Sequence, residues 1–125
     1  MIYLDLLLQA THGTLRFVGK QTVFPAFSHD TRQLAVGELF VAVRGERSDG
    51  HMYLRDAIRS GAVGVLVEAR SFSNLSEEIQ QQLEQLEITT VVVDDTRLAL
   101  QEYASFILQA WHPTVIAVTG SVPGL

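Results

Sequence analysis

Apolar residues along this chain form two kinds of pattern, continuous runs and helically spaced positions, and segments of the two kinds alternate from residue 39 onward. Four short apolar runs rich in β-branched residues predict strands: 39–43, 63–67, 88–93 and 114–118. Apolar residues recur at helical spacing in the three segments between them: 52–60, 75–86 and 97–110. This order predicts an α/β fold in which a small, mainly parallel sheet is flanked by helices.

Capping residues support the predicted helix boundaries. Gly61 lies just past the end of the first helix, where a left-handed residue is common. Asn74, with Glu77 three residues later, is predicted to cap the second helix. Asp95 or Thr96 is predicted to cap the third.

The first 27 residues carry a weaker pattern. Leu4, Leu7 and Leu8 lie at helical spacing within 3–10, and Gly13 is predicted to end that helix. The mixed stretch 15–27 predicts two short strands or extended segments.

Composition narrows the class of protein. The 125 residues correspond to one domain, and 47% apolar against 18% charged residues predicts a folded core. A net charge of −5 argues against nucleic acid as a partner. The absence of cysteine excludes disulfides, thiolate chemistry and cysteine zinc sites. No apolar run has the length of a membrane span, and the N-terminus lacks the features of a signal peptide, so a cytoplasmic protein is expected.

Ligands in parallel sheets bind beyond the carboxyl ends of the strands, which directs attention to the loops there. The loop 44–51 combines two glycines, two arginines, a serine and a histidine. Ser48 or Asp49 is predicted to cap the next helix, whose N-terminus would attract an anion together with Arg44 and Arg47. The alternative is a polar turn that only caps the helix.

A second polar segment, 28–32, precedes the first strong strand. It is either a local turn in which Asp30 holds Arg32, or a surface that presents Thr31 to a base or sugar.

Other candidates for chemistry are weaker. Asp94 and Asp95 would suit magnesium, but a helix cap is the simpler interpretation of their position. The four histidines show no metal-ligand spacing, so no metal site is expected, and no Ser-His-Asp arrangement emerges. An oxidoreductase or flavodoxin-like domain would fit the fold pattern, but no G-x-G-x-x-G follows the first strand.

The chain contains an ordered series of motifs: D-T-R at 30–32, G-E-L-F-V-A-V at 37–43, G-E-R-S-D-G-H at 45–51, D-T-R-L-A at 95–99 and V-I-A-V-T-G-S at 115–121. This series resembles the N-terminal domain of the bacterial Mur ligases, which extend the UDP-linked peptidoglycan precursor. Thr119-Gly120-Ser121 resembles the MurF branch, which adds D-alanyl-D-alanine to a UDP-N-acetylmuramoyl tripeptide. The MurE branch, which adds an amino acid to the dipeptide precursor, is the alternative.

The resemblance implies a substrate-binding role for residues 1–113, with UDP-N-acetylmuramoyl peptide as partner. It places Thr31 and Arg32, with the backbone near His29, against the uridine end. It makes Glu46, Arg47 and Ser48 the opposite wall of the nucleotide site, whereas Asp49, Gly50 and His51 shape the loop and start the helix.

The resemblance also implies that residues 114–125 begin the ATP-binding central domain, with Thr119, Gly120 and Ser121 as an incomplete phosphate loop. Pro123, Gly124 and Leu125 stand where the family has Gly, Lys and Ser or Thr. We therefore expect no cofactor and no catalysis in this chain alone, and expect ATP and Mg²⁺ to act in an intact ligase with central and C-terminal domains. A stand-alone binding or interaction module is the alternative from another class.

Overall fold

A five-stranded sheet forms the centre of the fold. The computed structural model describes residues 1–111. Strand order in the sheet is β2-β7-β6-β5-β4. The strands are β2 (Thr14–Phe17), β4 (Phe27–Ser28), β5 (Leu39–Val41), β6 (Gly64–Glu68) and β7 (Thr89–Val93). Strands β4 to β7 run parallel, and β2 joins β7 antiparallel at the opposite edge. The predicted α/β fold with a mainly parallel sheet is thus confirmed.

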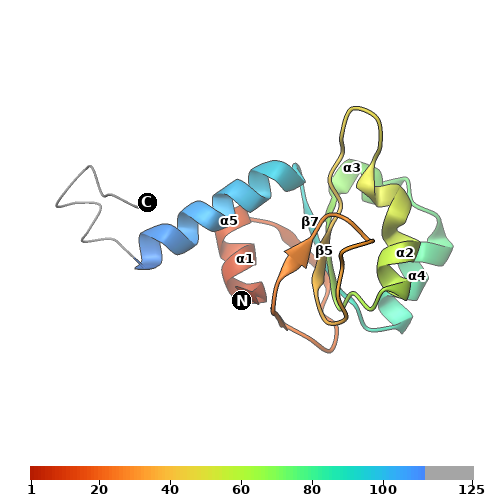
Figure 1. Ribbon diagram of the computed structural model, residues 1–125, viewed down its shortest axis with the longest axis horizontal. Helices are drawn as coiled ribbons and strands as arrows, with labels where there is room; N and C mark the ends of the chain where they lie inside the picture. The colour runs from red at the N-terminus through yellow and green to blue at the C-terminus, as the bar shows by residue number, and fades with distance from the viewer. Residues whose placement is uncertain (112–125) are drawn as a thin grey trace.

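Helices cover both faces of this sheet (Figure 1). α1 (Leu4–Thr11) and α5 (Thr96–Trp111) lie on one side, and α2 (Leu54–Arg59) and α4 (Glu77–Gln85) lie on the other. The remaining elements are short: the 3-10 turn η1 (Gly50–Tyr53), α3 (Ala69–Ser73) and a separate antiparallel pair of β1 (Ile2–Tyr3) with β3 (Val23–Phe24). No helix among residues 1–111 is long and apolar enough to cross a membrane.

Alternate residues of the central strands supply two separate cores. Leu39 and Val41 of β5 pack with α1 and α5, whereas Phe40 and the following Ala42 pack with α2 and α4. Because side chains alternate across a strand, a run that is apolar at every position suits a sheet covered on both faces. This explains why β5 and β6 are buried throughout.

Helix ends agree with the sequence predictions at two places. Gly61 adopts a φ of +94° just after α2, and an added Cβ there would approach Val36 to 2.9 Å. Asp95 caps α5, since its Oδ1 accepts the amide of Leu98 at 3.1 Å.

Two other predicted boundaries are wrong. His12, not Gly13, ends α1 in the left-handed region with a φ of 55°. Ser76, not Asn74, caps α4 by accepting the amide of Ile79 at 3.4 Å, because Asn74 instead ends the unpredicted helix α3. The stretch 15–27 contributes to three short strands rather than two. The strand predicted at 114–118 lies outside the described residues.

Candidate functional site

A cleft of about 610 Å³ lies between the loops that follow β4 and β5. These two strands are parallel neighbours, so their carboxyl ends open at the same edge of the sheet. The residues lining the cleft come from both loops and from the turn and helix that follow: His29, Asp30, Thr31, Arg32, Ser48, Tyr53 and Asp56. The two polar segments that the sequence singles out therefore share one cleft.

The segment 28–32 forms a compact turn that fixes one wall. Asp30 accepts the amide of Arg32 at 2.9 Å and receives its guanidinium through both carboxylate oxygens, at 3.1 and 2.9 Å. These hydrogen bonds hold the pKa of Asp30 below its usual value. The Thr31 carbonyl accepts a hydrogen bond from Ser60 Oγ at 3.4 Å, which links the turn to the end of α2. The interpretation as a local turn is confirmed, and Thr31 also lines the cleft.

Each acid in the cleft has an arginine partner. Asp30 pairs with Arg32 at 2.9 Å, and Asp56 pairs with Arg59 at 3.6 Å. These are exposed pairs of little stabilising value, but they offset the negative charge of the wall. A polar or anionic ligand therefore meets less repulsion than the number of carboxylates suggests.

The loop 44–51 contributes Ser48 to the other wall of the cleft. The loop projects beyond the end of the sheet (Figure 1). Gly45 N donates to Ser48 O at 2.8 Å, and Gly50 N donates to Val43 O at 2.9 Å. Neither glycine has a positive φ, because the described glycines with positive φ are Gly37 and Gly61. Gly50 is needed for close packing instead, since an added Cβ would lie 2.7 Å from Val43 N.

The inner end of this loop is buried against β6. The ring of His51 is 2% exposed, its Nδ1 lies 2.6 Å from Asp49 Oδ1, and its Nε2 accepts the amide of Glu68 at 2.9 Å. Because Nε2 is an acceptor, we assign the ring proton to Nδ1, which donates it to Asp49. Burial opposes ionisation of Asp49, but the backbone and ring hydrogen bonds from His51 outweigh it and lower the pKa of Asp49.

Several donors of the predicted anion site at the helix start are engaged within the protein. Asp49 caps the turn as predicted, and its Oδ1 takes the amide of His51 at 3.0 Å while its carbonyl takes that of Met52 at 3.0 Å. Arg44 does not line the cleft, and its Nε lies 3.4 Å from the buried carboxylate of Glu68. The donors that would have attracted an anion therefore have partners within the protein.

The predicted site residues fall into four groups. His29, Thr31, Arg32 and Ser48 line the cleft. Glu46 and Arg47 are exposed in the turn and do not line the cleft. Gly50 and His51 are buried and Asp49 is partly buried, and none of these three lines the cleft. Thr119, Gly120 and Ser121 lie outside the described residues. Tyr53 and Asp56 also line the cleft but were not predicted to do so. The feature that could have indicated them is their position in the helical segment directly after the loop 44–51.

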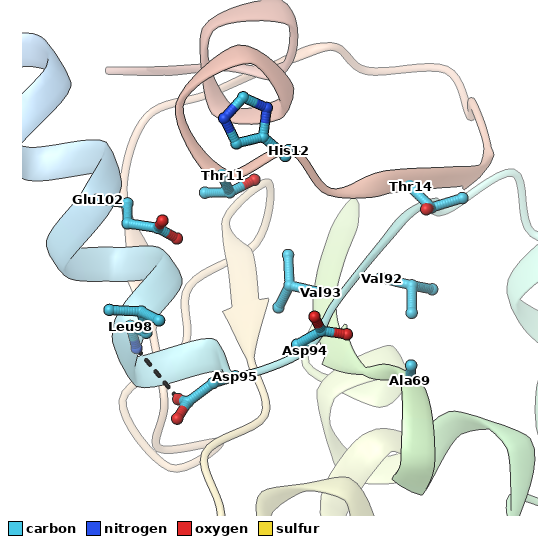
Figure 2. Close-up of a pocket in the computed structure, with 10 residues that line it drawn as sticks. All are labelled: Thr11, His12, Thr14, Ala69, Val92, Val93, Asp94, Asp95, Leu98 and Glu102. Atoms are coloured by element: carbon cyan, nitrogen blue, oxygen red, sulfur yellow. Dashed lines mark hydrogen bonds between the residues drawn. The ribbon is translucent and has the colours of Figure 1, made fainter.

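A second hollow, of about 340 Å³, lies at the carboxyl end of β7 (Figure 2). His12, Asp94, Asp95 and Glu102 contribute to its lining, and Asp95 is engaged as the cap of α5. Within the described residues, no group of three or more potential metal-ligating side chains comes together. The cap interpretation of Asp95 is thus the one that the geometry supports, and the acidic lining disfavours an anionic ligand.

Comparison with known proteins identifies relatives along most of the chain. Residues 26–107 match the family model described as "Mur ligase family, catalytic domain". The UDP-N-acetylmuramoyl-tripeptide--D-alanyl-D-alanine ligase of Bacillus subtilis is 38% identical over 102 residues, covering 82% of this chain and 20% of that protein. The UDP-N-acetylmuramoyl-L-alanyl-D-glutamate--2,6-diaminopimelate ligase of Chlorobium phaeobacteroides is 35% identical over 109 residues, covering 82% and 19%. The chain thus spans about a fifth of the length of these curated relatives.

Solved structures support the same fold. MurF from Acinetobacter baumannii matches with a TM-score of 0.67 at 24% identity, covering 86% of this chain and 21% of that one. The regulatory CBS and DRTGG domains of a Clostridium perfringens pyrophosphatase match with a TM-score of 0.62 at 15% identity, covering 83% and 46%. The fold alone therefore does not specify a ligase, and the family rests on the sequence match. With about two thirds of its residues matched by the family model, the chain belongs to the Mur ligase family.

Proposed function

We propose that this chain is the part of a peptidoglycan-precursor ligase that binds the UDP end of UDP-N-acetylmuramoyl peptide. The observation that carries the proposal is the cleft in which Thr31 and Ser48 face a common space. Its volume of about 610 Å³ lies in the range of small-molecule sites. No hydrogen bond within the described residues engages the Thr31 hydroxyl, so this hydroxyl is available to a ligand.

The walls of the cleft suit a uridine nucleotide. Tyr53, an aromatic residue that is 44% exposed, lines the cleft together with Thr31 and Ser48. Hydroxyls and backbone groups provide hydrogen bonds for a base and a ribose, and Arg47 in the adjoining turn supplies positive charge for the diphosphate. Arg32 provides a second guanidinium on the opposite wall.

Within this proposal, the chain contributes positioning rather than chemistry. Binding energy from the remote nucleotide holds the reacting end of the precursor in place and is converted into rate elsewhere in the enzyme. The ligase of which this chain is a part would act in the cytoplasm with ATP and Mg²⁺. The residues that would begin the ATP site, 119–121, lie outside the described part of the chain.

The MurF-like branch is the one we favour within the family. The relatives named tripeptide--D-alanyl-D-alanine ligases reach 39% identity, and a diaminopimelate ligase reaches 35%. The two activities separate in an assay of the whole ligase. Amide formation with D-alanyl-D-alanine supports the MurF-like branch, and amide formation only with a diamino acid contradicts it.

Titration of UDP into the 125-residue chain, followed by calorimetry, tests the binding role. Thr31→Ala and Ser48→Ala each remove one hydrogen bond and are expected to weaken binding about 2- to 15-fold. Thr14→Ala is the matched control, because Thr14 is an exposed threonine that lines the other hollow. Failure of the wild-type chain to bind UDP, or equal losses in the control, would contradict the proposal and favour an interaction module.

A further inference from the structure

A buried carboxylate lies at the end of β6, outside the lining of the cleft. The side chain of Glu68 is 5% exposed and follows four apolar or small residues in a strand that is buried throughout. Removing a carboxylate from water is costly unless it is paired and hydrogen-bonded. An apolar residue would fill this position more simply, so the carboxylate calls for a reason beyond packing.

The contacts of Glu68 join the cleft loop to the start of α5. Its Oε1 lies 3.4 Å from Nε of Arg44, the first residue of the loop 44–51. Its Oε2 accepts the amide of Thr96, the first residue of α5, at 3.1 Å. The Thr96 hydroxyl has one proton, and its 2.8 Å contact with Ala42 O, against 3.3 Å to Glu68, assigns that proton to Ala42.

The backbone of the same residue holds the other end of the loop. Glu68 N donates to His51 Nε2 at 2.9 Å, and the ring of His51 binds Asp49 on its far side. The loop therefore touches Glu68 at both ends, at Arg44 through the carboxylate and at His51 through the amide. Between these two anchors lies Ser48, which lines the cleft.

We propose that Glu68 is the positioning residue of the nucleotide site: its carboxylate fixes Arg44, and with it the loop 44–51, against the start of α5. The proposal rests on the proposed function only in taking this loop as a wall of the UDP site. Glu68 itself touches no ligand and acts through Arg44 and Thr96. The same contacts make the start of α5 part of the support of the cleft.

Amide hydrogen exchange in the ligand-free chain tests the positioning role directly. Glu68→Gln keeps the size of the side chain and an acceptor for Thr96 but removes the charge that holds Arg44. We expect the loop amides of Gly45 and Gly50 to exchange at least tenfold faster, while the amides of β7 keep their wild-type rates. Glu84→Gln makes the same chemical change on the exposed face of α4 and is expected to leave the loop rates unchanged.

Arg44→Gln provides a second variant that removes the same ion pair. The Arg44 side chain is 48% exposed, so this substitution changes the exposed partner and leaves the buried Glu68 in place. If Glu68→Gln does not fold, Arg44→Gln replaces it in the test, and we expect the amides of Gly45 and Gly50 to exchange faster in this variant. Unchanged loop rates, or equal acceleration of the loop and of β7, would overturn the proposal, since the second outcome indicates only a general loss of stability.

UDP binding separates this inference from the proposed function. We expect Glu68→Gln to weaken UDP binding about 5- to 20-fold and Glu84→Gln to leave it unchanged. Wild-type affinity in Glu68→Gln refutes the positioning role. A wild-type chain that does not bind UDP refutes the proposed function, while the exchange rates still decide whether Glu68 orders the loop.

Discussion

Substitution of Gly50 by alanine tests whether the loop 44–51 requires a residue without a side chain at position 50. An added Cβ at Gly50 would lie 2.7 Å from Val43 N, 3.0 Å from Ala42 Cα and 3.1 Å from Val43 O. All three atoms belong to the backbone of the preceding strand end, so no side chain can rotate away. The loop must move by several tenths of an ångström, and the hydrogen bond from Gly50 N to Val43 O, now 2.9 Å, must distort.

Two costs set the expected magnitude for Gly50→Ala. Overpacking of a buried position typically costs about 1–3 kcal/mol, and weakening of the hydrogen bond adds up to about 1 kcal/mol. We therefore expect the free energy of unfolding to fall by about 1–4 kcal/mol. Urea unfolding followed by circular dichroism measures this change as a shift of the midpoint at constant slope.

Gly45→Ala in the same loop is the matched control. An added Cβ there meets only Ser48 O at 3.4 Å, an ordinary contact, and the residue does not have a positive φ. Alanine at this site restricts the unfolded chain and is expected to change the free energy of unfolding by less than about 1 kcal/mol. Equal effects of the two substitutions would refute the reasoning from backbone proximity.

Three further predictions concern the carboxylate of Asp49, the hydrogen bond from Thr96 to Ala42 and the apolar core around Leu83. The lowered pKa of Asp49 means that its stabilising contribution is fully present above the usual value of 3.8 and is lost as pH falls through the lower folded value. The destabilisation caused by Asp49→Asn, measured in urea titrations, should therefore shrink as pH falls below 3.8, and a difference that stays constant there contradicts the reasoning. Thr96→Val leaves Ala42 O without its donor and should cost about 1–3 kcal/mol, whereas Thr14→Val on the exposed edge strand should cost less than about 0.5 kcal/mol. Leu83→Ala, at a fully buried position of α4, should cost about 2–5 kcal/mol, against less than about 1 kcal/mol for Leu86→Ala at a position that is 56% exposed.

The central part of the fold is predictable because its signals are local. Strand β5 is apolar throughout, and β6 and β7 each contain three consecutive apolar residues, which suits a sheet covered on both faces. The helices between them keep their apolar residues at helical spacing, and Leu54 and Ala57 of α2 are fully buried as that spacing predicts. The pattern that predicts each of these elements lies within its own residues, so each can be predicted without knowing which elements it packs against.

The short elements escaped prediction because their pattern is no longer than one turn or one strand pair. α3 has five residues, of which only Phe72 is buried, so no periodicity could mark it. Its presence moves the start of α4 from Asn74 to Ser76, since two good capping residues stand two positions apart and tertiary context chooses between them. His12 likewise takes the left-handed position that glycine usually fills.

Placement of the site residues was predictable only in part. Parallel topology places the carboxyl ends of β4 and β5 side by side, and this places Thr31 and Ser48 around one cleft. The orientation of Arg44 was not predictable, because its partner Glu68 lies 24 positions away and its carboxylate ends an otherwise apolar run. An acidic residue that closes a fully apolar strand was the available signal.

The strand order explains why one loop serves both the cleft and the interior. β5 has β4 on one side and β6 on the other, so the loop that leaves β5 meets the 28–32 turn on one flank and the end of β6 on the other. Ser48 faces the first flank, and His51 faces the second. A substitution on the inner flank therefore alters the cleft without touching a ligand, and a substitution at the exposed tip, such as Arg47→Ala, alters charge without altering the position of the loop.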